Sequence, residues 1–252
     1  MSESDVKSAR RVFEILETFD RHRRPMALKE ILDELGYPTS SGSALLKSLM
    51  NLGYLDYDRR QRTYFPTMRV ALLGGWVGEA LFGDSALLEV MESLHQTCGE
   101  TMILGIQSDL HVQYVHAIVS NEVLQFRAPP GTRRPMARSG MGWALLAAKS
   151  DTEIEDLRRR INAKSEEKVS WEEIMTRVHE VRSRGYAFSK STVTEGAGLI
   201  AVAVWRPASG RLFAIAAAGY LPRLERKEAE IAAALREAVT RLSDHQLMEL
   251  DV

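Results

Sequence analysis

The stretch ALKEILDELGYPTSSGSALLKSLMNLGYL, residues 27–55, contains two short amphipathic segments separated by a polar turn. Apolar residues recur at helical spacing in the first segment, which predicts a helix over 27–35 that ends at Gly36. A second helix is predicted over 40–52, with Gly53 ending it. Two helices that meet across so short a turn are typical of a helix-turn-helix motif.

The two sides of the second helix differ in chemistry. At 100° per residue, Leu45, Leu49 and Leu52 lie on one side, which is expected to face the core. The opposite side carries small hydroxyls and a lysine but no acid, namely Ser40, Ser43 and Lys47. Such a short polar face can enter the major groove of DNA and bond phosphates and base edges.

The flanking segments complete a winged helix-turn-helix plan. A helix is expected over 6–19, and its apolar stripe consists of Val6, Ala9, Phe13 and Leu16, widened by Val12, Ile15 and Phe19. After the motif, 54–57 and 63–66 are predicted to form a β-hairpin. The hairpin tip reads Asp-Arg-Arg-Gln-Arg, and its arginines could reach backbone phosphates or the minor groove.

The rest of the chain predicts a linker and an α+β domain. A connecting helix is expected over 68–80, and Gly83-Asp84-Ser85 is expected to break the chain and cap the next helix. Further helices are expected near 85–97, 139–149, 154–161, 171–185 and at the C-terminal end. Predicted strands are 100–107, 111–119, 122–128, 199–206 and 211–219, with a turn through Pro207–Gly210 before the last. This order indicates a mostly antiparallel sheet flanked by helices. The predicted domains are 1–66, a linker helix at 67–81, and 82–252.

The composition limits the classes of protein to which this chain can belong. The 252 residues include 33 Lys+Arg and 34 Asp+Glu, a net charge of −1, and 45% are hydrophobic, which is ordinary for a globular protein. Residues 1–70 hold 12 basic and 10 acidic side chains, so the excess of positive charge lies in the predicted DNA-binding part. No apolar run approaches the roughly 18–20 residues of a membrane span, and no signal segment opens the chain. A cytoplasmic protein without a membrane partner is expected.

The chain offers little for enzyme chemistry. Gly196–Ala201 matches GxGxxA, but a strand follows it where a dinucleotide site needs a helix. Ser139-Gly140-Met141-Gly142 lacks the first glycine of a nucleophile elbow. His95 and the single cysteine, Cys98, are three residues apart, but no second pair completes a metal site. We therefore expect no enzyme activity, no cofactor and no metal.

Taken together, the motifs resemble the IclR family of bacterial transcription regulators. The resemblance runs from Val6 to about Leu242 and rests on the order of several motifs. These are SARRVFEILETF, the stretch at 27–55, YDRRQRTYFPT, RRPMARSGMGWALLA, SWEEIMTRVHEVRSRGYAFS and GLIAVAVWRPASGRLFAIAAAG. The family implies a winged helix-turn-helix domain, a linker helix and an effector-binding domain resembling a GAF fold. It also implies homodimers or tetramers on double-stranded, palindromic operator DNA, controlled by a small-molecule effector, with repression, activation or both.

The resemblance places the recognition helix at Thr39–Leu52. The residues expected at DNA are Thr39, Ser40, Ser43 and Lys47, with Arg59, Arg60 and Arg62 on the wing. One position departs from the family pattern, because many members have an arginine where this chain has Ala44. Its loss removes a contact worth about 1–3 kcal/mol, so either the operator differs or the wing compensates.

The resemblance also implies an effector pocket between the helix after RRPMARSGMG and the facing sheet. By position, its residues are Leu124, Gly140, Met141, Ser189, Leu199, Ala216 and Ala218. Amides near Gly140 open a helix, where a carboxylate is favoured. The small apolar walls suggest a larger or aromatic acid, and Arg138, which replaces a commoner histidine, is either its counter-ion or a surface residue.

The proposed control is allosteric. The effector would favour one placement of two recognition helices, through a linker whose glycines permit bending. Two alternatives stay open: an enzyme fused to a DNA tether, using Cys98 or His95, and a winged helix that binds another protein. The absence of an acidic recognition face and the arginines of the wing argue against the second.

Overall fold

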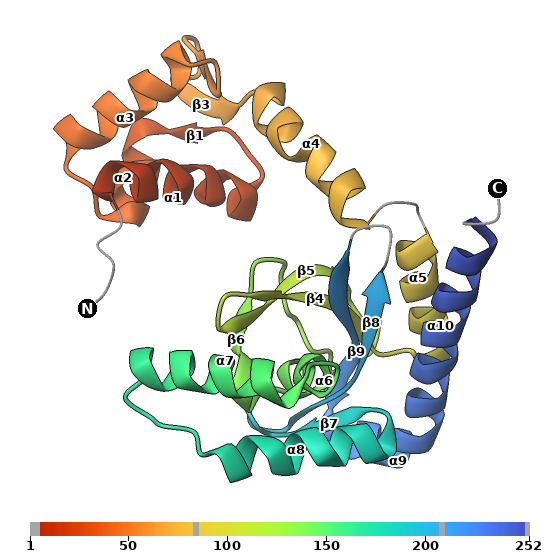
Figure 1. The fold of residues 1–252 in the computed structure, drawn as a ribbon. Coiled ribbons are helices and arrows are strands. Elements are labelled where there is room, and N and C mark those ends of the chain that lie inside the picture. The colour runs from red at the N-terminus through yellow and green to blue at the C-terminus, as the bar shows by residue number, and fades with distance from the viewer. Residues whose placement is uncertain (1–5, 83–85, 207–209, 250–252) are drawn as a thin grey trace. The chain divides into compact units, whose positions relative to one another are not determined.

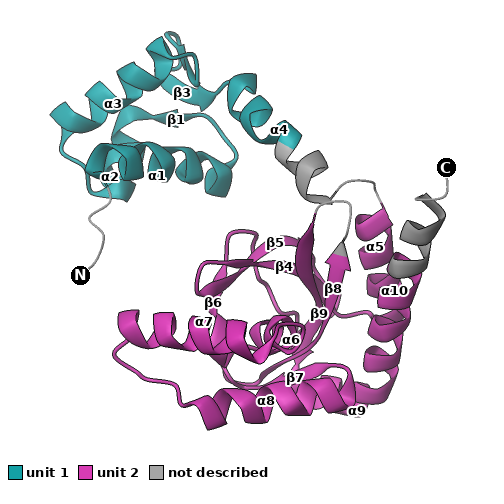
Figure 2. Ribbon diagram, viewed as in Figure 1, with its two compact units in different colours: residues 1–81 teal, residues 82–252 magenta. Residues whose placement is uncertain are grey.

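The computed structural model describes residues 6–82, 86–206 and 210–249. The chain forms two compact units, residues 1–81 and 82–252, and each is described by itself (Figure 2). The predicted cap at Gly83–Ser85 and most of the predicted turn at Pro207–Gly210 lie outside the described residues. Within the described part, no helix is both long and apolar enough to cross a membrane.

The first unit consists of the helices α1, α2 and α3 with a small sheet, followed by the helix α4 (Figure 1). A three-stranded antiparallel sheet has the order β1-β3-β2, and the hairpin of β2 and β3 is the predicted wing. The two-residue strand β1 was not predicted, because so short a segment carries no periodicity. The elements are α1 (Lys7–His22), β1 (Met26–Ala27), α2 (Leu28–Leu35), α3 (Thr39–Asn51), β2 (Leu55–Asp58), β3 (Thr63–Pro66) and α4 (Met68–Phe82).

The buried faces of α1 and α3 differ in part from those predicted, whereas α2 buries Ile31 and Leu32 of its predicted face. In α3, Leu46 and Leu49 are buried whereas Leu52 is exposed. The reason is the close packing of α3 on α2 at Gly42, where a Cβ would lie 2.1 Å from Leu32 Cδ2. This contact brings the side of α3 that holds Gly42, Leu46 and Leu49 against the core. The predicted stripe on α1 is buried only toward its C-terminal end: Val6, Ala9 and Phe13 are exposed, whereas Ile15 and Phe19, which widen the stripe, are buried.

The second unit is an α+β domain built on a six-stranded sheet of order β6-β5-β4-β9-β8-β7, in which every neighbouring pair is antiparallel. The predicted strand at 122–128 is wrong, because this segment has no regular structure. The elements are α5 (Ala86–Cys98), β4 (Thr101–Ser108), β5 (His111–Ile118), β6 (Arg133–Pro135), the 3₁₀ helix η1 (Met136–Arg138), α6 (Gly140–Ala147), α7 (Asp151–Lys164), α8 (Trp171–Arg184), β7 (Ala187–Lys190), β8 (Ala197–Arg206), β9 (Arg211–Tyr220), α9 (Leu221–Arg226) and α10 (Glu228–Glu249).

Helices cover both faces of this sheet and form two cores. On one face, Leu199 and Ala201 of β8 pack in a core with residues of α6, α7 and α8. On the other face, Ile200 and Val202 pack in a core with residues of α5, α9 and α10 (Figure 1). Alternate residues of one strand therefore serve opposite layers, as the period of two requires.

Candidate functional site

The polar side of α3 is open to solvent. Thr39, Ser40 and Lys47 are exposed and Ser43 is half-buried. The Ser43 hydroxyl donates to the Ser40 carbonyl oxygen at 3.2 Å, so its proton is used within the helix and its oxygen remains an acceptor. Ala44 lies on the same open surface and adds no bulk. This side of α3 is therefore short enough for close approach to another molecule.

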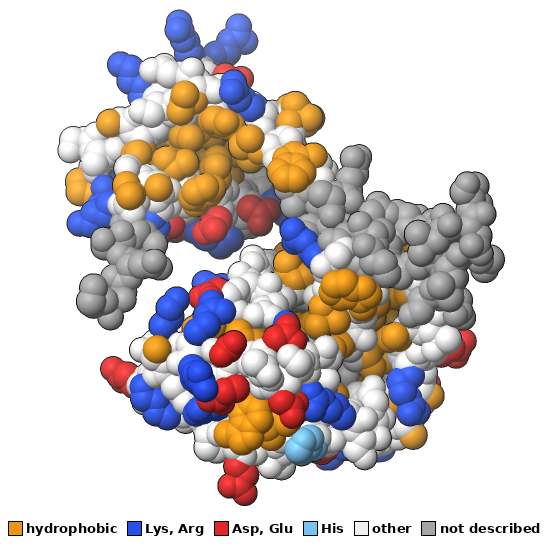
Figure 3. Space-filling view, in the orientation of Figure 1, with side chains coloured by type: hydrophobic (Ala, Val, Ile, Leu, Met, Phe, Trp, Pro, Cys, Tyr) orange, Lys and Arg blue, Asp and Glu red, His pale blue; other side chains and the backbone are white. Residues whose placement is uncertain are grey.

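The tip of the wing presents three cations. Asp58 Oδ1 accepts hydrogen bonds from the backbone amides of Arg60 (2.7 Å) and Gln61 (3.1 Å), which closes the tip into a tight turn. Arg62 takes a left-handed conformation with φ 56°. The guanidinium groups of Arg59, Arg60 and Arg62 are exposed, and no ion pair within the described residues includes them. Figure 3 shows Lys and Arg side chains projecting from one end of this unit.

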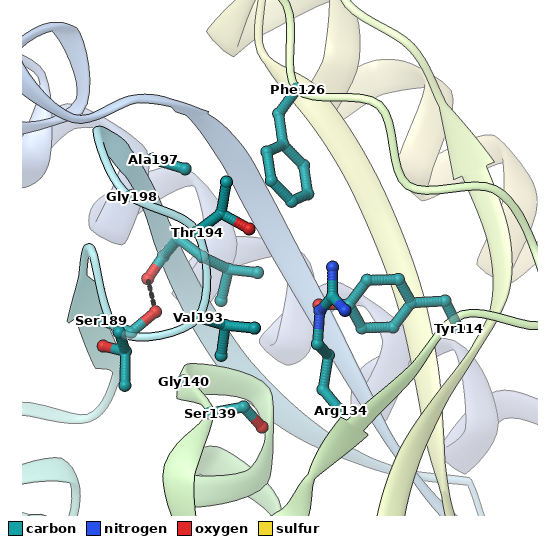
Figure 4. Close-up of a pocket in the computed structure, with 12 residues that line it drawn as sticks. Tyr114, Phe126, Arg134, Ser139, Gly140, Ser189, Val193, Thr194, Ala197 and Gly198 are labelled. Carbon is teal, nitrogen blue, oxygen red and sulfur yellow. Dashed lines mark hydrogen bonds between the residues drawn. The ribbon is translucent and has the colours of Figure 1, made fainter.

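A second candidate site is a cavity in the other unit, over the edge of the sheet where β7, β8 and α6 meet. Its cavity volume is about 30 Å³, and about 350 Å³ of space lies between its walls when the open solvent at its mouth is included. Arg134 and Tyr114 lie on one side, with Ser189, Val193 and Thr194 opposite (Figure 4). The lining residues are Tyr114, Phe126, Arg134, Ser139, Gly140, Ser189, Thr192, Val193, Thr194, Ala197, Gly198 and Leu199.

The start of α6 forms the floor of this cavity. Ser139 caps the helix, because its Oγ accepts a hydrogen bond from the Gly142 amide at 3.2 Å. At Gly140, a Cβ would lie 2.7 Å from Ser189 Oγ and 3.0 Å from Leu199 Cδ2, so only glycine lets α6 approach the sheet this closely. Ser189 and Leu199 are direct cross-strand partners on β7 and β8.

One wall of the cavity combines a cation with an aromatic ring. The Arg134 guanidinium carbon lies 6.0 Å from the centroid of the Tyr114 ring. Burial raises the pKa of Tyr114, so its phenol stays protonated at neutral pH. No carboxylate pairs with Arg134 in the part of the chain that the structure describes. The cation is therefore available to a negatively charged ligand.

Arg138 lies in a different setting. Its guanidinium is ion-paired with Glu167 and donates to the Lys168 carbonyl oxygen at 3.3 Å. Arg138 does not line the cavity. Of the two roles left open from the sequence, the structure places this arginine in an exposed surface ion pair.

The structure brings only some of the expected effector residues together. Gly140, Ser189 and Leu199 line the cavity. Met141, Ala216 and Ala218 are fully buried in the core beneath it and do not reach the cavity surface. The Leu124 side chain is 62% exposed and lies outside the lining.

Sequence reasoning missed the polar wall. Arg134 belongs to the three-residue strand β6, which pairs with β5 and so comes to lie beside Tyr114. Phe126 lies in the irregular segment that was predicted as a strand, and Thr192–Thr194 lie in a turn between β7 and β8. No periodic signal marks such segments, because tertiary pairing alone places them.

The groups considered for catalysis do not form a reactive set. Cys98 is buried, and burial raises the pKa of its thiol to about 11. Nδ1 of His95 lies 2.9 Å from the Glu100 carbonyl oxygen. Across the described residues, no three His, Cys, Asp or Glu side chains are grouped so as to hold a metal ion.

Two family models match separate parts of the chain. Residues 85–244 match the family described as "Bacterial transcriptional regulator IclR C-terminal", and residues 8–59 match the IclR helix-turn-helix domain. The chain is 23% identical over 230 residues to the transcriptional regulator XynR of Escherichia coli K12, covering 90% of each protein. It is 24% identical over 239 residues to the transcriptional repressor IclR of the same organism, covering 87% of this chain and 82% of the repressor.

Solved structures show the same fold. The IclR protein of Thermotoga maritima matches 95% of this chain and 98% of its own, with a TM-score of 0.76 at 16% identity. The effector domain of an IclR regulator from Acinetobacter sp. ADP1 matches 66% of this chain and 98% of its own, with a TM-score of 0.58 at 28% identity.

A helix-turn-helix domain joined to an effector domain defines a DNA-binding transcriptional regulator. The chain belongs to the IclR family of bacterial transcriptional regulators. This family consists of regulators and not of enzymes, which decides against the alternative of a tethered enzyme.

Proposed function

We propose that this regulator binds operator DNA as a homo-oligomer and that a small aromatic carboxylic acid, bound in the cavity of the second unit, sets its operator affinity. The proposed effector class rests on Arg134, which lies beside Tyr114 and has no carboxylate partner among the described residues. Its guanidinium lies in a cavity that also contains Phe126, Val193 and Leu199. A ligand that has an anionic group and a flat apolar ring would match both the guanidinium and these apolar side chains.

The DNA-binding half of the proposal rests on the open face of α3 and on the wing. The hydroxyls of Thr39, Ser40 and Ser43 and the ammonium of Lys47 suit phosphates and base edges. The three wing arginines are exposed without ion pairs among the described residues, so their positive charge is available to the DNA backbone. They would supply phosphate contacts that Ala44 cannot make.

The start of α6 supports the choice of a carboxylate. The first-turn amides of a helix carry partial positive charge and favour an anion. Gly140, at the first position of α6, lines the cavity together with Arg134. A carboxylate bound there would face both the helix start and the guanidinium.

A second copy of the chain would cover the linker helix. Met68, Leu72 and Trp76 follow one another at i, i+4 and i+8 along α4, and all three are exposed, Leu72 to 70% and Trp76 to 67%. An apolar stripe of this kind is unfavourable in water and marks an interaction surface. Two copies would also supply the pair of recognition helices that a palindromic operator needs.

The test compares charged and uncharged aromatic ligands in a thermal-shift assay on the full chain. Benzoate is expected to raise the Tm, and benzamide, which has the same ring without the charge, is expected to do so far less. Arg134→Gln should abolish the benzoate shift, whereas Arg138→Gln, which removes an equivalent cation outside the cavity, should retain it. A gel shift on DNA upstream of the neighbouring genes then measures whether benzoate changes operator affinity.

Equal stabilisation by benzamide and benzoate, or an undiminished benzoate shift in Arg134→Gln, would contradict the proposed carboxylate site. Failure of the wild-type chain to bind any DNA from its own locus would contradict the operator-binding half.

A further inference from the structure

One wall of the cavity belongs to a segment that has no regular structure of its own. Residues 119–128 follow β5 and carry Phe126 into the cavity lining. Thr101 at the start of β4 holds this segment from below: its hydroxyl donates to the Phe126 carbonyl oxygen at 2.8 Å and accepts from the Ser120 amide at 3.0 Å. Thr101 is fully buried, so both bonds are shielded from water.

A buried ion pair holds the same segment from the side. The Glu100 side chain has no exposed surface and Arg223 of α9 is 14% exposed. Their contact is two-pronged, with Arg223 Nε 2.5 Å from Glu100 Oε1 and Nη2 2.6 Å from Oε2. The same Nη2 also donates to the Leu124 carbonyl oxygen at 3.1 Å. Leu124 is two residues from Phe126, so the ion pair is joined directly to the cavity wall.

The strand beside the pair is shaped to admit it. A Cβ on Gly219 would lie 2.3 Å from Glu100 Oε2, so glycine at this position gives the carboxylate its room on β9. The hydrogen bond with Glu100 raises the pKa of the Arg223 guanidinium, which favours its charged form.

Stability alone is a weak explanation for this arrangement. Removing two charges from water costs several kcal/mol, and apolar side chains of the same volume are often equally stabilising. An arginine adds what an apolar pair cannot, because its planar fork binds both carboxylate oxygens and still has N–H groups for Leu124. What distinguishes this ion pair from an apolar pair is therefore that it holds the segment 119–128 in place through the Leu124 carbonyl.

The helix that carries Arg223 also holds the opposite wall. The Leu221 amide at the start of α9 donates to the Gly196 carbonyl oxygen at 2.9 Å. The Gly196 amide donates to Ser191 Oγ at 3.1 Å across the turn that holds Val193 and Thr194, which line the cavity (Figure 4). Leu224 of the same helix is buried in the core that includes residues of α5 and α10. One short helix thus contacts both irregular walls of the cavity and the core that includes residues of α5 and α10.

We propose that Arg223, held by Glu100, is a positioning residue for effector recognition: it fixes Phe126 at the cavity and couples that wall to α9. This inference rests on the proposed function, in which the cavity binds the effector. A ligand that moves Phe126 would act on the Leu124 carbonyl and so on Arg223 and α9 together.

The first test needs no ligand. Hydrogen exchange of the full chain is measured by mass spectrometry for wild type, Arg223→Lys and Thr101→Val. Lysine keeps the charge but loses the fork, and valine keeps the shape but loses the hydroxyl. Both variants should exchange amides in 119–128 at least about tenfold faster, because each removes a hydrogen bond to that segment.

The matched control is Arg182→Lys. Arg182 also joins a carboxylate, Asp151, to backbone carbonyls, those of Ala147 and Lys149, but it contacts no wall of the cavity. Exchange in 119–128 should be unchanged in this variant. If the amides of 119–128 exchange at the wild-type rate in both Arg223→Lys and Thr101→Val, the inference is overturned.

The second test uses benzoate as the probe in calorimetric titrations. Arg223→Lys and Thr101→Val should weaken its binding by about tenfold, whereas Thr101→Ser, which restores the hydroxyl, and Arg182→Lys should bind as wild type. Undiminished affinity in Arg223→Lys would overturn the positioning role. If wild type itself does not bind benzoate, the proposed effector class fails, and the exchange measurement alone then decides the role of Arg223.

Discussion

At the scale of single residues, the proposed function depends on which cations lack an acidic partner. Arg138 is neutralised by Glu167, and Arg223 by Glu100. Lys47, Arg134 and the wing arginines have no ion pair among the described residues, and each lies on a surface proposed to bind an anion. An unpaired guanidinium or ammonium can form an ion pair with a ligand, whereas a paired one is already bound to a carboxylate of the protein.

We expect Lys47→Ala to weaken operator binding by about five- to tenfold and to reduce the slope of log K against log salt by about 1, because one phosphate contact and its released counterion are lost. Fluorescence anisotropy across a salt titration measures both quantities. Lys164→Ala, which removes a lysine paired with Asp109 in the other unit, is the control and should leave the slope unchanged. A wild-type slope in Lys47→Ala would exclude Lys47 as a phosphate contact.

At the scale of elements, close approach of backbones sets the geometry of the site. The corner between η1 and α6 is the tightest example, because a Cβ on Gly142 would lie 2.0 Å from the Met136 carbonyl oxygen. That carbonyl belongs to the backbone and cannot rotate away as a side chain would. By contrast, a Cβ on Gly75 of α4 would meet nothing within 4 Å.

Gly142→Ala is therefore expected to destabilise the second unit by about 1–3 kcal/mol through overpacking. Gly75→Ala, the same change in an open helix, should be neutral or stabilising by up to about 1 kcal/mol through helix propensity. Differential scanning calorimetry of both variants measures the difference. Equal Tm values for the two would show that the corner relaxes without cost.

At the scale of the whole molecule, the proposed regulator is complete only with a second copy. The exposed stripe of Met68, Leu72 and Trp76 on α4 has no partner among the described residues of its own unit. Because the two recognition helices of an operator complex come from two chains, the same association would determine both solubility and DNA binding.

The double variant Leu72→Glu/Trp76→Glu should lower the molar mass in multi-angle light scattering and weaken operator binding, because two charges cannot be buried at an apolar interface. Trp171→Glu, which places the same charge at a partly exposed tryptophan of α8, serves as the control and should leave the mass unchanged. An unaltered mass in the double variant would place the association elsewhere.

The sequence alone was enough for the family, for the winged helix-turn-helix plan and for an antiparallel sheet flanked by helices. These rest on local signals: helical spacing in 27–35, glycines that end helices at Gly36 and Gly53, and the apolar run in 199–206. It also identified Gly140, Ser189 and Leu199, which line the cavity, because resemblance transfers position along the chain.

Tertiary structure alone decided which helix faces are buried and what completes the cavity. Gly42 packs against Leu32 and so brings Leu46, rather than Leu45, to the core of the first unit. Arg134 and Phe126 reach the cavity from a three-residue strand and an irregular segment, which carry no periodic signal. Their positions follow from the pairing of β6 with β5 and from Arg223, which is 123 residues away from Glu100 in the chain. Contacts between such distant residues depend on how the layers pack, and no local pattern encodes them.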